Sequence, residues 1–162
     1  VSCSIHNRHM GGTMPTALPD LSIREGTDVP TKALLDLYES VGWTAYTQDP
    51  DTLANAVAQS TYVVTAWEGE TLVGLARVLS DDATLAFLQD ILVVPRLQGA
   101  RVGSMLMGSV LDRFAHVRQK VLLTDDDPAQ HRFYGTHGFS DTQLLRKTKL
   151  HAFVRYEGMF LS

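Results

Sequence analysis

Residues 88–103, LQDILVVPRLQGARVG, carry the clearest structural signal in this sequence. Its apolar run ends at Pro95, and a Gln-Gly turn then opens a strongly helical segment. A strand that stops at a proline and is followed at once by a helix N-terminus gathers several free backbone N–H groups at one point. These amides, together with the positive end of the helix dipole, favour phosphate oxygens. The stretch therefore predicts a site for a phosphorylated ligand.

The composition is that of an ordinary globular protein. A chain of 162 residues, 44% hydrophobic and 20% charged, has the length to bury a real core. Fourteen basic residues against eighteen acidic ones give a net charge of -4, which argues against general nucleic-acid binding. No apolar run approaches the roughly 18 residues of a membrane span, and the N-terminus lacks the apolar core of a signal peptide. We expect a cytoplasmic protein that binds neither nucleic acid nor a membrane.

Residues 1–19 show no periodicity, and the His-Met-Gly-Gly piece at 9–12 is typical of a cloning remnant. We expect this segment to be a disordered leader or such a remnant, and residues 20–162 to form a single domain. The one cysteine, Cys3, lies in the leader, so neither an intrachain disulfide nor a multi-cysteine zinc site is available. The histidines have no metal-ligand spacing, and the acidic turn at 125–127 is better explained by solvation and helix capping. We predict no metal.

Hydrophobic periodicity and turn residues predict alternating strands and helices that form a mixed α/β layer fold. Two clear signals are the hairpin turn at Gly69-Glu70 and the helix start at Asp127-Pro128. The predicted order is a strand at 21–25, a helix from Pro30 to Gly42, a second helical pattern after Asp49-Pro50, strands at 62–68, 72–79 and 85–94, a helix at 99–116, a strand at 120–124, a short helix through Tyr134, a strand from Phe139 and a last strand at 153–160.

Three segments resemble, in their order and separation, motifs of the GNAT superfamily of acyl-CoA-dependent N-acyltransferases. They are LVVPRLQGARVGSML at 92–106, similar to V-x-P followed by Gln/Arg-x-x-Gly-x-Gly/Ala; KVLLT at 120–124, similar to the strand after the long helix; and HRFYGTHGF at 131–139, similar to Phe-Tyr-x-x-x-Gly-Phe. The likeness covers about residues 21–162. It implies an α/β fold of the α+β type, with a mixed, mostly antiparallel central sheet flanked by helices and a V-shaped splay between two parallel strands.

The resemblance also implies acetyl-CoA as co-substrate, with its pantetheine arm in the splay and its diphosphate on the turn. A backbone amide near Leu92 or Val93 would polarise the thioester carbonyl. Arg101 stands where the family usually has a glycine, and its side chain is a candidate for a bond to phosphate. Asp127 aligns with an asparagine that contacts the CoA arm in relatives, although it also suits a helix cap. The expected CoA-binding residues are Leu92, Val93, Val94, Gln98, Gly99, Ala100, Arg101, Val102, Gly103, Ser104 and Asp127.

Two residues are candidates for proton transfer. Tyr134 occupies the position of the tyrosine that protonates the departing thiolate in many relatives, or else it is a core aromatic residue of a short helix. Asp90 lies on the splayed strand beside Gln89, and strict alternation places one of the two on the acceptor side. Asp90 is the candidate general base. Alternatively it is a polar residue on the outer face of the strand, and a water chain serves as the base.

Trp43, Tyr46 and Arg77 are the candidates for acceptor binding. The first two lie in an irregular segment that walls the acceptor pocket in relatives, and an arginine facing the cleft would bind a carboxylate. We expect transfer of an acetyl group from acetyl-CoA to the primary amine of a small molecule, by direct attack in a ternary complex. The alternatives are a non-catalytic acyl-CoA-binding or sensing module and a protein N-terminal or lysine acetyltransferase. A homodimer through the last predicted strand is also possible.

Overall fold

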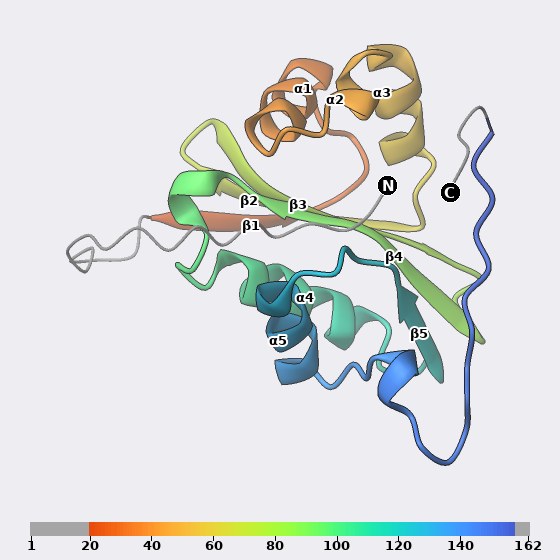
Figure 1. Cartoon of the computed structure of the whole chain (residues 1–162). Helices are drawn as coiled ribbons and strands as arrows, with labels where there is room; N and C mark the ends of the chain where they lie inside the picture. The colour runs from red at the N-terminus through yellow and green to blue at the C-terminus, as the bar shows by residue number, and fades with distance from the viewer. Residues whose placement is uncertain (1–19, 158–162) are drawn as a thin grey trace.

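The structure is a computed structural model that describes residues 20–157, with helices on both faces of a sheet (Figure 1). The expectations for residues 1–19, including Cys3, and for the end of the last predicted strand lie outside the described residues. The elements follow the order β1 (Leu21–Glu25), α1 (Thr31–Ser40), α2 (Thr44–Thr47), α3 (Pro50–Ala58), β2 (Tyr62–Glu68), β3 (Thr71–Ser80), β4 (Leu85–Val93), a 3-10 turn at Pro95–Leu97, α4 (Val102–Arg113), β5 (Gln119–Leu122), α5 (Pro128–Thr136) and a 3-10 turn at Thr142–Leu144.

The five strands lie in sequence order, β1-β2-β3-β4-β5. The first three pairings are antiparallel: short turns join β2 to β3 and β3 to β4, whereas α1 to α3 connect β1 to β2. The last pairing, β4 with β5, is parallel, because α4 carries the chain back across one face of the sheet. The predicted fold class is confirmed: a mixed, mostly antiparallel sheet is flanked by helices.

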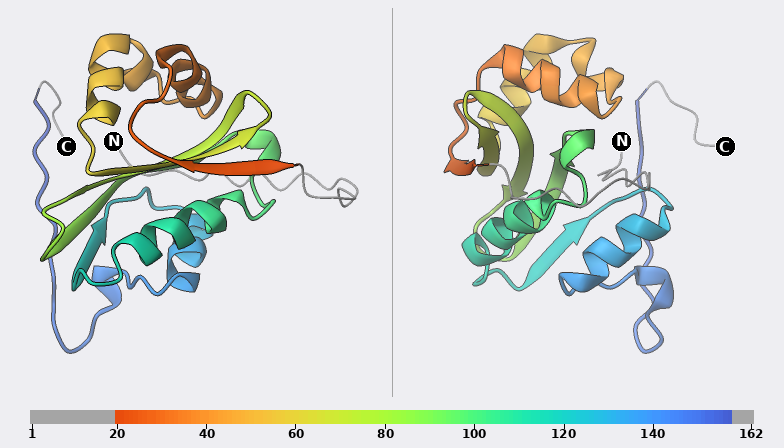
Figure 2. Two further views of the ribbon diagram at one scale, coloured as in Figure 1. Left: turned by 180° about the vertical axis from the view of Figure 1, so that it is seen from behind. Right: turned by 90° about the vertical axis from the view of Figure 1, so that its left-hand side faces the viewer.

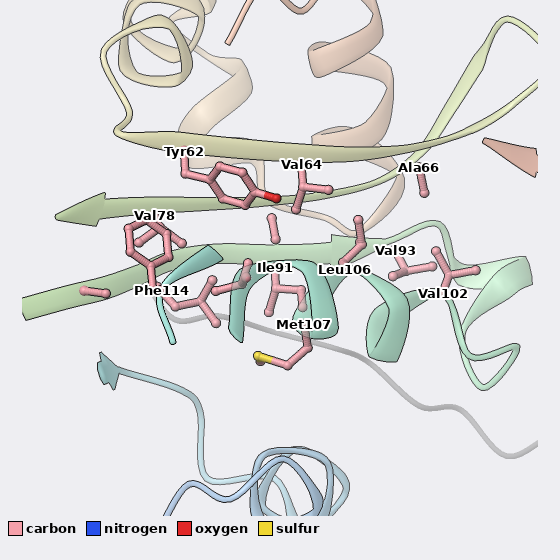
Figure 3. Close-up of a cluster of buried hydrophobic side chains, with 14 of the residues drawn as sticks. Tyr62, Val64, Ala66, Val78, Ile91, Val93, Val102, Leu106, Met107 and Phe114 are labelled. Carbon is pink, nitrogen blue, oxygen red and sulfur yellow. The ribbon is translucent and has the colours of Figure 1, made fainter. Parts of the chain in front are cut away.

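Apolar clusters lie on both faces of the sheet. Helices α1 to α3 cover one face and α4 and α5 the other, as two further views make clear (Figure 2). On the α4 face, Leu106, Met107 and Phe114 pack against strand residues such as Val64 and Ile91 (Figure 3). Helix α4 comes so close to β3 that a Cβ on Gly74 would lie 3.0 Å from Leu106 Cδ1. This contact fixes the distance of α4 from the sheet, and with it the position of the N-terminus of the helix.

The structure differs from the sequence prediction at two places. Helix α4 begins at Val102 and not at residue 99, because Gly99 and Arg101 both have left-handed backbone angles, with φ of 83° and 69°. The strands predicted from Phe139 and from Phe153 are not formed within the described residues; after bends at 146–148, residues 149–156 run as an extended segment along the side of the molecule (Figure 1). Within residues 20–157, no helix is both long and apolar enough to cross a bilayer.

Candidate active site

The site begins where β4 leaves β5. The parallel ladder joins Leu85–Leu88 to Gln119–Leu122, whereas β4 continues to Val93. At the same point the pairing with β3 shifts: Arg77 faces Asp90, but Val78 faces Leu88. Gln89 is therefore an extra residue, a β-bulge that bends β4 away from β5. The second half of β4 thus turns one backbone edge toward the gap, as the predicted splay requires.

Alternation along β4 decides which amides face that gap. The N–H of Val94 donates to Val73 O at 2.9 Å, so this pair is hydrogen-bonded across to β3. In an antiparallel ladder such pairs alternate, so Leu92 also points its N–H toward β3 and Val93 points its N–H the other way. Of the two amides proposed from the sequence to polarise a thioester, the geometry favours Val93.

The turn after β4 uses several of its own amides internally. The N–H of Gln98 donates to Pro95 O and that of Ala100 to Leu97 O, at 3.2 and 3.1 Å. The Gln98 side chain donates to Val93 O at 3.1 Å. These contacts argue against direct phosphate contacts from the amides of Gln98 and Ala100, and give both residues a role in shaping the turn.

The start of α4 supplies the remaining donors. The cap residue is Arg101, whose side chain carries no acceptor for the amides of the first turn. A helix leaves its first four N–H groups without intrahelical acceptors, here those of residues 101 to 104. Together with the helix dipole they favour an anion at this end.

A cavity of about 190 Å³ opens in front of these amides. It is lined by Val93, Gln98, Gly99, Arg101, Gly103, Ser104, Ala129 and Phe133. The cavity therefore joins the Val93 end of the splay to the N-terminus of α4 and to α5. Besides Val93, five residues predicted from the sequence to bind CoA line this cavity: Gln98, Gly99, Arg101, Gly103 and Ser104. Phe133 was not among the residues predicted for the site; its spacing of four from Ala129, one helical turn, was the available signal.

Asp127 caps α5 and Tyr134 lies within it, next to the cavity-lining residues Ala129 and Phe133. The Asp127 side chain caps α5 by accepting the N–H of Ala129 at 2.8 Å. Tyr134 is buried in the core, and its ring contacts those of Phe133 and Phe139. Its neighbour Phe133 lines the cavity, whereas Tyr134 is not among the lining residues. The predicted roles of Asp127 in CoA contact and of Tyr134 in proton donation stay predictions.

On the opposite face of the sheet, Asp90 is the centre of a buried polar cluster. It forms an ion pair with the Nε of Arg77, and the side chains are only 1% and 6% exposed. The hydroxyl of Tyr38 donates to Oδ2 of Asp90 at 2.9 Å, and that of Tyr46 donates to Oδ1 at 3.0 Å. Trp43 stacks on Tyr46 at a ring separation of 5.9 Å. The cluster joins α1, α2, β3 and β4.

This cluster changes the interpretation of two predicted site residues. Arg77 is buried and its guanidinium is committed to Asp90, which argues against the carboxylate-binding role expected from the sequence. Asp90 accepts from a guanidinium and from the Tyr38 and Tyr46 phenols, which argues against its acting as a general base. The expected alternation of Gln89 and Asp90 also fails, because the bulge turns both toward the Tyr46 hydroxyl, which Gln89 Nε2 approaches to 3.5 Å.

Burial and the charge of Asp90 also perturb the phenols. Burial, and then the negative charge of Asp90, raise the pKa of Tyr46 to about 12. The same causes raise the pKa of Tyr38 well above its ordinary value. Both phenols therefore keep their protons at any physiological pH and serve as hydrogen-bond donors to Asp90.

A second cavity, of about 250 Å³, lies beside Tyr46. Its wall consists of Tyr46, Phe87, Gln89, Leu123 and Tyr156. Phe87 and Gln89 are two positions apart on β4, a spacing that could have predicted their shared face, whereas no sequence signal placed Tyr156 there. Of the three residues predicted for acceptor binding, only Tyr46 lines this cavity. Trp43 stacks on the Tyr46 ring without being a lining residue. Within residues 20–157, no group of three His, Cys, Asp or Glu side chains is arranged to hold a metal ion.

Comparison with known proteins shows the family. The family model described as "Acetyltransferase (GNAT) domain" matches residues 38–159. The chain therefore belongs to the GNAT acetyltransferases, as the motifs predicted, and is of the acyltransferase class of enzymes. A GNAT-family acetyltransferase from Streptococcus pneumoniae is 28% identical and superimposes with a TM-score of 0.70, over 84% of this chain and 99% of that one.

Two further relatives widen the comparison. A Gibberella zeae protein named "Putative acetyltransferase FG08082" is 29% identical over 118 residues. The match takes in 70% of this chain but only 64% of that relative's length. The structure of AAC(6')-Iy in complex with a bisubstrate analogue, CoA-S-monomethyl-acetylneamine, superimposes with a TM-score of 0.61 at 14% identity, over 82% of this chain and 99% of that one. This last likeness shows a shared fold.

Proposed function

We propose that this chain transfers the acetyl group of acetyl-CoA to the primary amine of a small molecule, by direct attack in a ternary complex. The observation that carries the proposal is the position of the two cavities. One lies at the Val93 end of the unpaired half of β4, on the α4 side, and the other at the Gln89 end, on the α1–α3 side. Four strand residues span about 13 Å. Two substrates entering from opposite faces would meet at the splay.

The residues on the α4 side fit acetyl-CoA. The amides of residues 101 to 104, at the positive end of a helix, are suited to a diphosphate. The cavity in front of them continues to Val93 and is walled by the ring of Phe133 and the methyl of Ala129, which suit the less polar pantetheine arm. The co-substrate, when bound, supplies the activated acetyl group as a thioester. A likeness in fold to a protein whose structure holds a CoA-containing analogue agrees with this fit.

In the proposed reaction the amine nitrogen attacks the thioester carbonyl carbon, a C–N bond forms and the C–S bond breaks. The N–H of Val93 stabilises the charge that develops on the carbonyl oxygen. Tyr134 protonates the thiolate that leaves, and the proton lost from nitrogen returns to Tyr134 through solvent. A covalent acetyl-enzyme is not needed. The amine loses its ammonium proton to water before it attacks, because Asp90 is already engaged.

The acceptor is proposed to be a small molecule because its cavity is walled on several sides. Tyr156, from the extended segment after α5, contributes to the wall together with Tyr46 of α2 and two residues of β4. An enzyme acting on a protein N-terminus or lysine needs an open groove, whereas a walled aromatic cavity suits a free amine. The cytoplasmic location and the homodimer expected from the sequence stay predictions.

Two measurements test the proposal. Calorimetric titration of CoA into the protein should give a saturable heat, and a panel of amines with acetyl-CoA should release free thiol. Binding without thiol release from any amine would favour a sensing module. Release that needs a peptide N-terminus or lysine would favour a protein acetyltransferase, and absence of CoA binding would overturn the whole proposal.

A further inference from the structure

The cavity beside Tyr46 carries no charged side chain among the described residues that line it. Two tyrosines, a phenylalanine, a leucine and a glutamine form its wall, and all five are half-buried. Its volume of about 250 Å³ equals the share of roughly eight water molecules in the liquid, at ~30 Å³ each. That is room for a single ring with a short arm.

The carboxylate nearest in the structure to the Tyr46 hydroxyl does not make this cavity anionic. Asp90 stands behind Tyr46 and is paired with Arg77, so the charges of this buried pair largely cancel. Asp90 also accepts a hydrogen bond from the Tyr38 phenol, and its side chain is only 1% exposed. A cation entering the cavity would therefore lose its hydration without gaining a free counter-charge.

The same ion pair decides whether the Tyr46 hydroxyl donates or accepts a hydrogen bond in the cavity. A phenol has one proton, and Tyr46 donates it to Asp90 Oδ1 at 3.0 Å. Its pKa of about 12 keeps that proton in place. The lone pairs of the oxygen are left for donors on the cavity side, where Gln89 Nε2 makes only a long contact of 3.5 Å. Tyr46 is thus prepared to accept a hydrogen bond, not to give one.

We infer that this cavity selects amines with one nitrogen on an uncharged, mainly apolar body, and that the Tyr46 oxygen accepts a hydrogen bond from that nitrogen as the amine enters toward the splay. The inference rests on the proposed acetyl transfer and names the substrate class of the same site. Asp90 is a positioning residue in it, since it orients Tyr46 without reaching the amine. Polyamines and aminoglycosides, which carry several ammonium groups, are poor substrates by this reasoning.

A matched pair of amines tests the selectivity. Para-methylbenzylamine and para-xylylenediamine share one ring and one reacting group, and differ mainly by a second ammonium in place of hydrogen. We expect kcat/KM for the monoamine to exceed that for the diamine by about a hundredfold, because a second charge would be buried without a partner. Spermidine, a linear triamine, should be acetylated no better than the diamine.

Variants test the geometry. Tyr46→Phe should raise KM for para-methylbenzylamine about tenfold, with kcat and CoA affinity unchanged. The matched control is Tyr62→Phe, which removes a phenol that also donates to a carboxylate, Glu25 at 2.9 Å, but on the α4 face of the sheet. Leu123→Asp puts a free carboxylate in the wall and should shift the preference toward the diamine.

The outcomes separate this inference from the proposed function. If CoA binds and thiol is released, but the diamine or spermidine is the better substrate, the substrate class is overturned and acetyl transfer stands. An unchanged KM in Tyr46→Phe together with an unchanged preference in Leu123→Asp would place the amine elsewhere. If CoA does not bind at all, both the function and the inference fail.

Discussion

The hydroxyl of Tyr46 donates to Oδ1 of Asp90 across 3.0 Å, although the two residues are 44 positions apart in the sequence. One partner belongs to the short helix α2 and the other to the bulged strand β4, so the contact ties the acceptor cavity to the splay. Because Arg77 and Tyr38 hold the same carboxylate, Asp90 is fixed and neutralised. We therefore interpret Asp90 as a support for Tyr46 and not as a base.

Replacing Asp90 by asparagine separates these roles. A lost general base would lower kcat by about 10²–10⁴-fold and remove the acidic limb of its pH profile. We expect instead a higher KM for the amine, a kcat at saturating amine that changes little, and a retained pH profile. Stability should fall by about 3–5 kcal/mol, because Arg77 is left buried and unpaired. Steady-state kinetics across pH and urea unfolding measure both effects.

The matched control for this variant is Glu25→Gln. Glu25 accepts the Tyr62 hydroxyl at 2.9 Å, an equivalent carboxylate–phenol pair away from the acceptor cavity. It should leave KM and kcat unchanged. A kcat loss in Asp90→Asn that disappears at high pH would restore Asp90 as the base.

Alkaline pH should destabilise the protein through its buried phenols. An exposed tyrosine has a pKa near ~10, whereas that of Tyr46 is raised to about 12 and that of Tyr38 is raised too. Between these values the folded chain keeps protons that the unfolded chain has lost. The stabilisation is therefore complete below about pH 10 and is lost as pH rises toward the folded pKa.

Urea unfolding at several pH values checks the effect. The free energy of unfolding should decline above about pH 10, and Tyr46→Phe should decline less steeply than the parent protein. An identical slope in the two proteins would mean that Tyr46 is not shielded as the geometry indicates.

Much of the site was predictable because its chemistry is local. Pro95, the Gln-Gly turn and the apolar face of α4 are contiguous in the sequence, so they predicted the end of β4 and the start of the helix. Asp127 and Pro128 likewise predicted the start of α5, and the structure shows the capping bond. The ends of α4 were missed by a few residues, and its start is postponed by left-handed angles at Gly99 and Arg101.

The acceptor side was less predictable because it depends on distant contacts. A bulge at Gln89 is visible only in the register between β3 and β4, and it overturns the alternation from which the side-chain directions were deduced. The pairing of Arg77 with Asp90 follows from that register as well. Tyr156 reaches the cavity on a segment that was expected to form a strand, and nothing in its neighbourhood indicated the contact.

Substituting Ser104 tests the anion site at the start of α4. Ser104 is exposed and lies in the helical first turn, beside the cavity. Ser104→Asp should stabilise the helix by about 0.3–1 kcal/mol through the dipole, yet it should weaken CoA binding about tenfold or more by repelling the diphosphate. The affinity loss should shrink at high salt. Calorimetry and thermal unfolding give the two numbers.

Ser109→Asp is the matched control, because it adds the same charge to the same helix five residues beyond Ser104. It should change CoA affinity little. Equal losses in both variants would indicate a general charge effect and argue against a diphosphate at the first turn.

Arg101 combines a strained backbone with a candidate phosphate contact. Its φ of 69° lies in the left-handed region, which costs a non-glycine residue roughly 1–2 kcal/mol. Arg101→Gly should therefore raise the melting temperature while leaving the amides of the turn in place. CoA affinity should nevertheless fall several-fold, because the guanidinium is lost. An unchanged affinity would show that the Arg101 side chain points away from the phosphates.

Tyr134→Phe tests the proposed thiolate acid. The ring is buried between Phe133 and Phe139, so phenylalanine should keep the packing and the CoA affinity. Without the hydroxyl, kcat should fall about a hundredfold, since general acid catalysis contributes at least that much. The loss should be smaller with an acetyl thioester whose thiol has a lower pKa, because such a thiolate leaves without a proton. Tyr62→Phe controls for the loss of a buried phenol. An unchanged kcat in Tyr134→Phe at every pH would assign the tyrosine to the core alone.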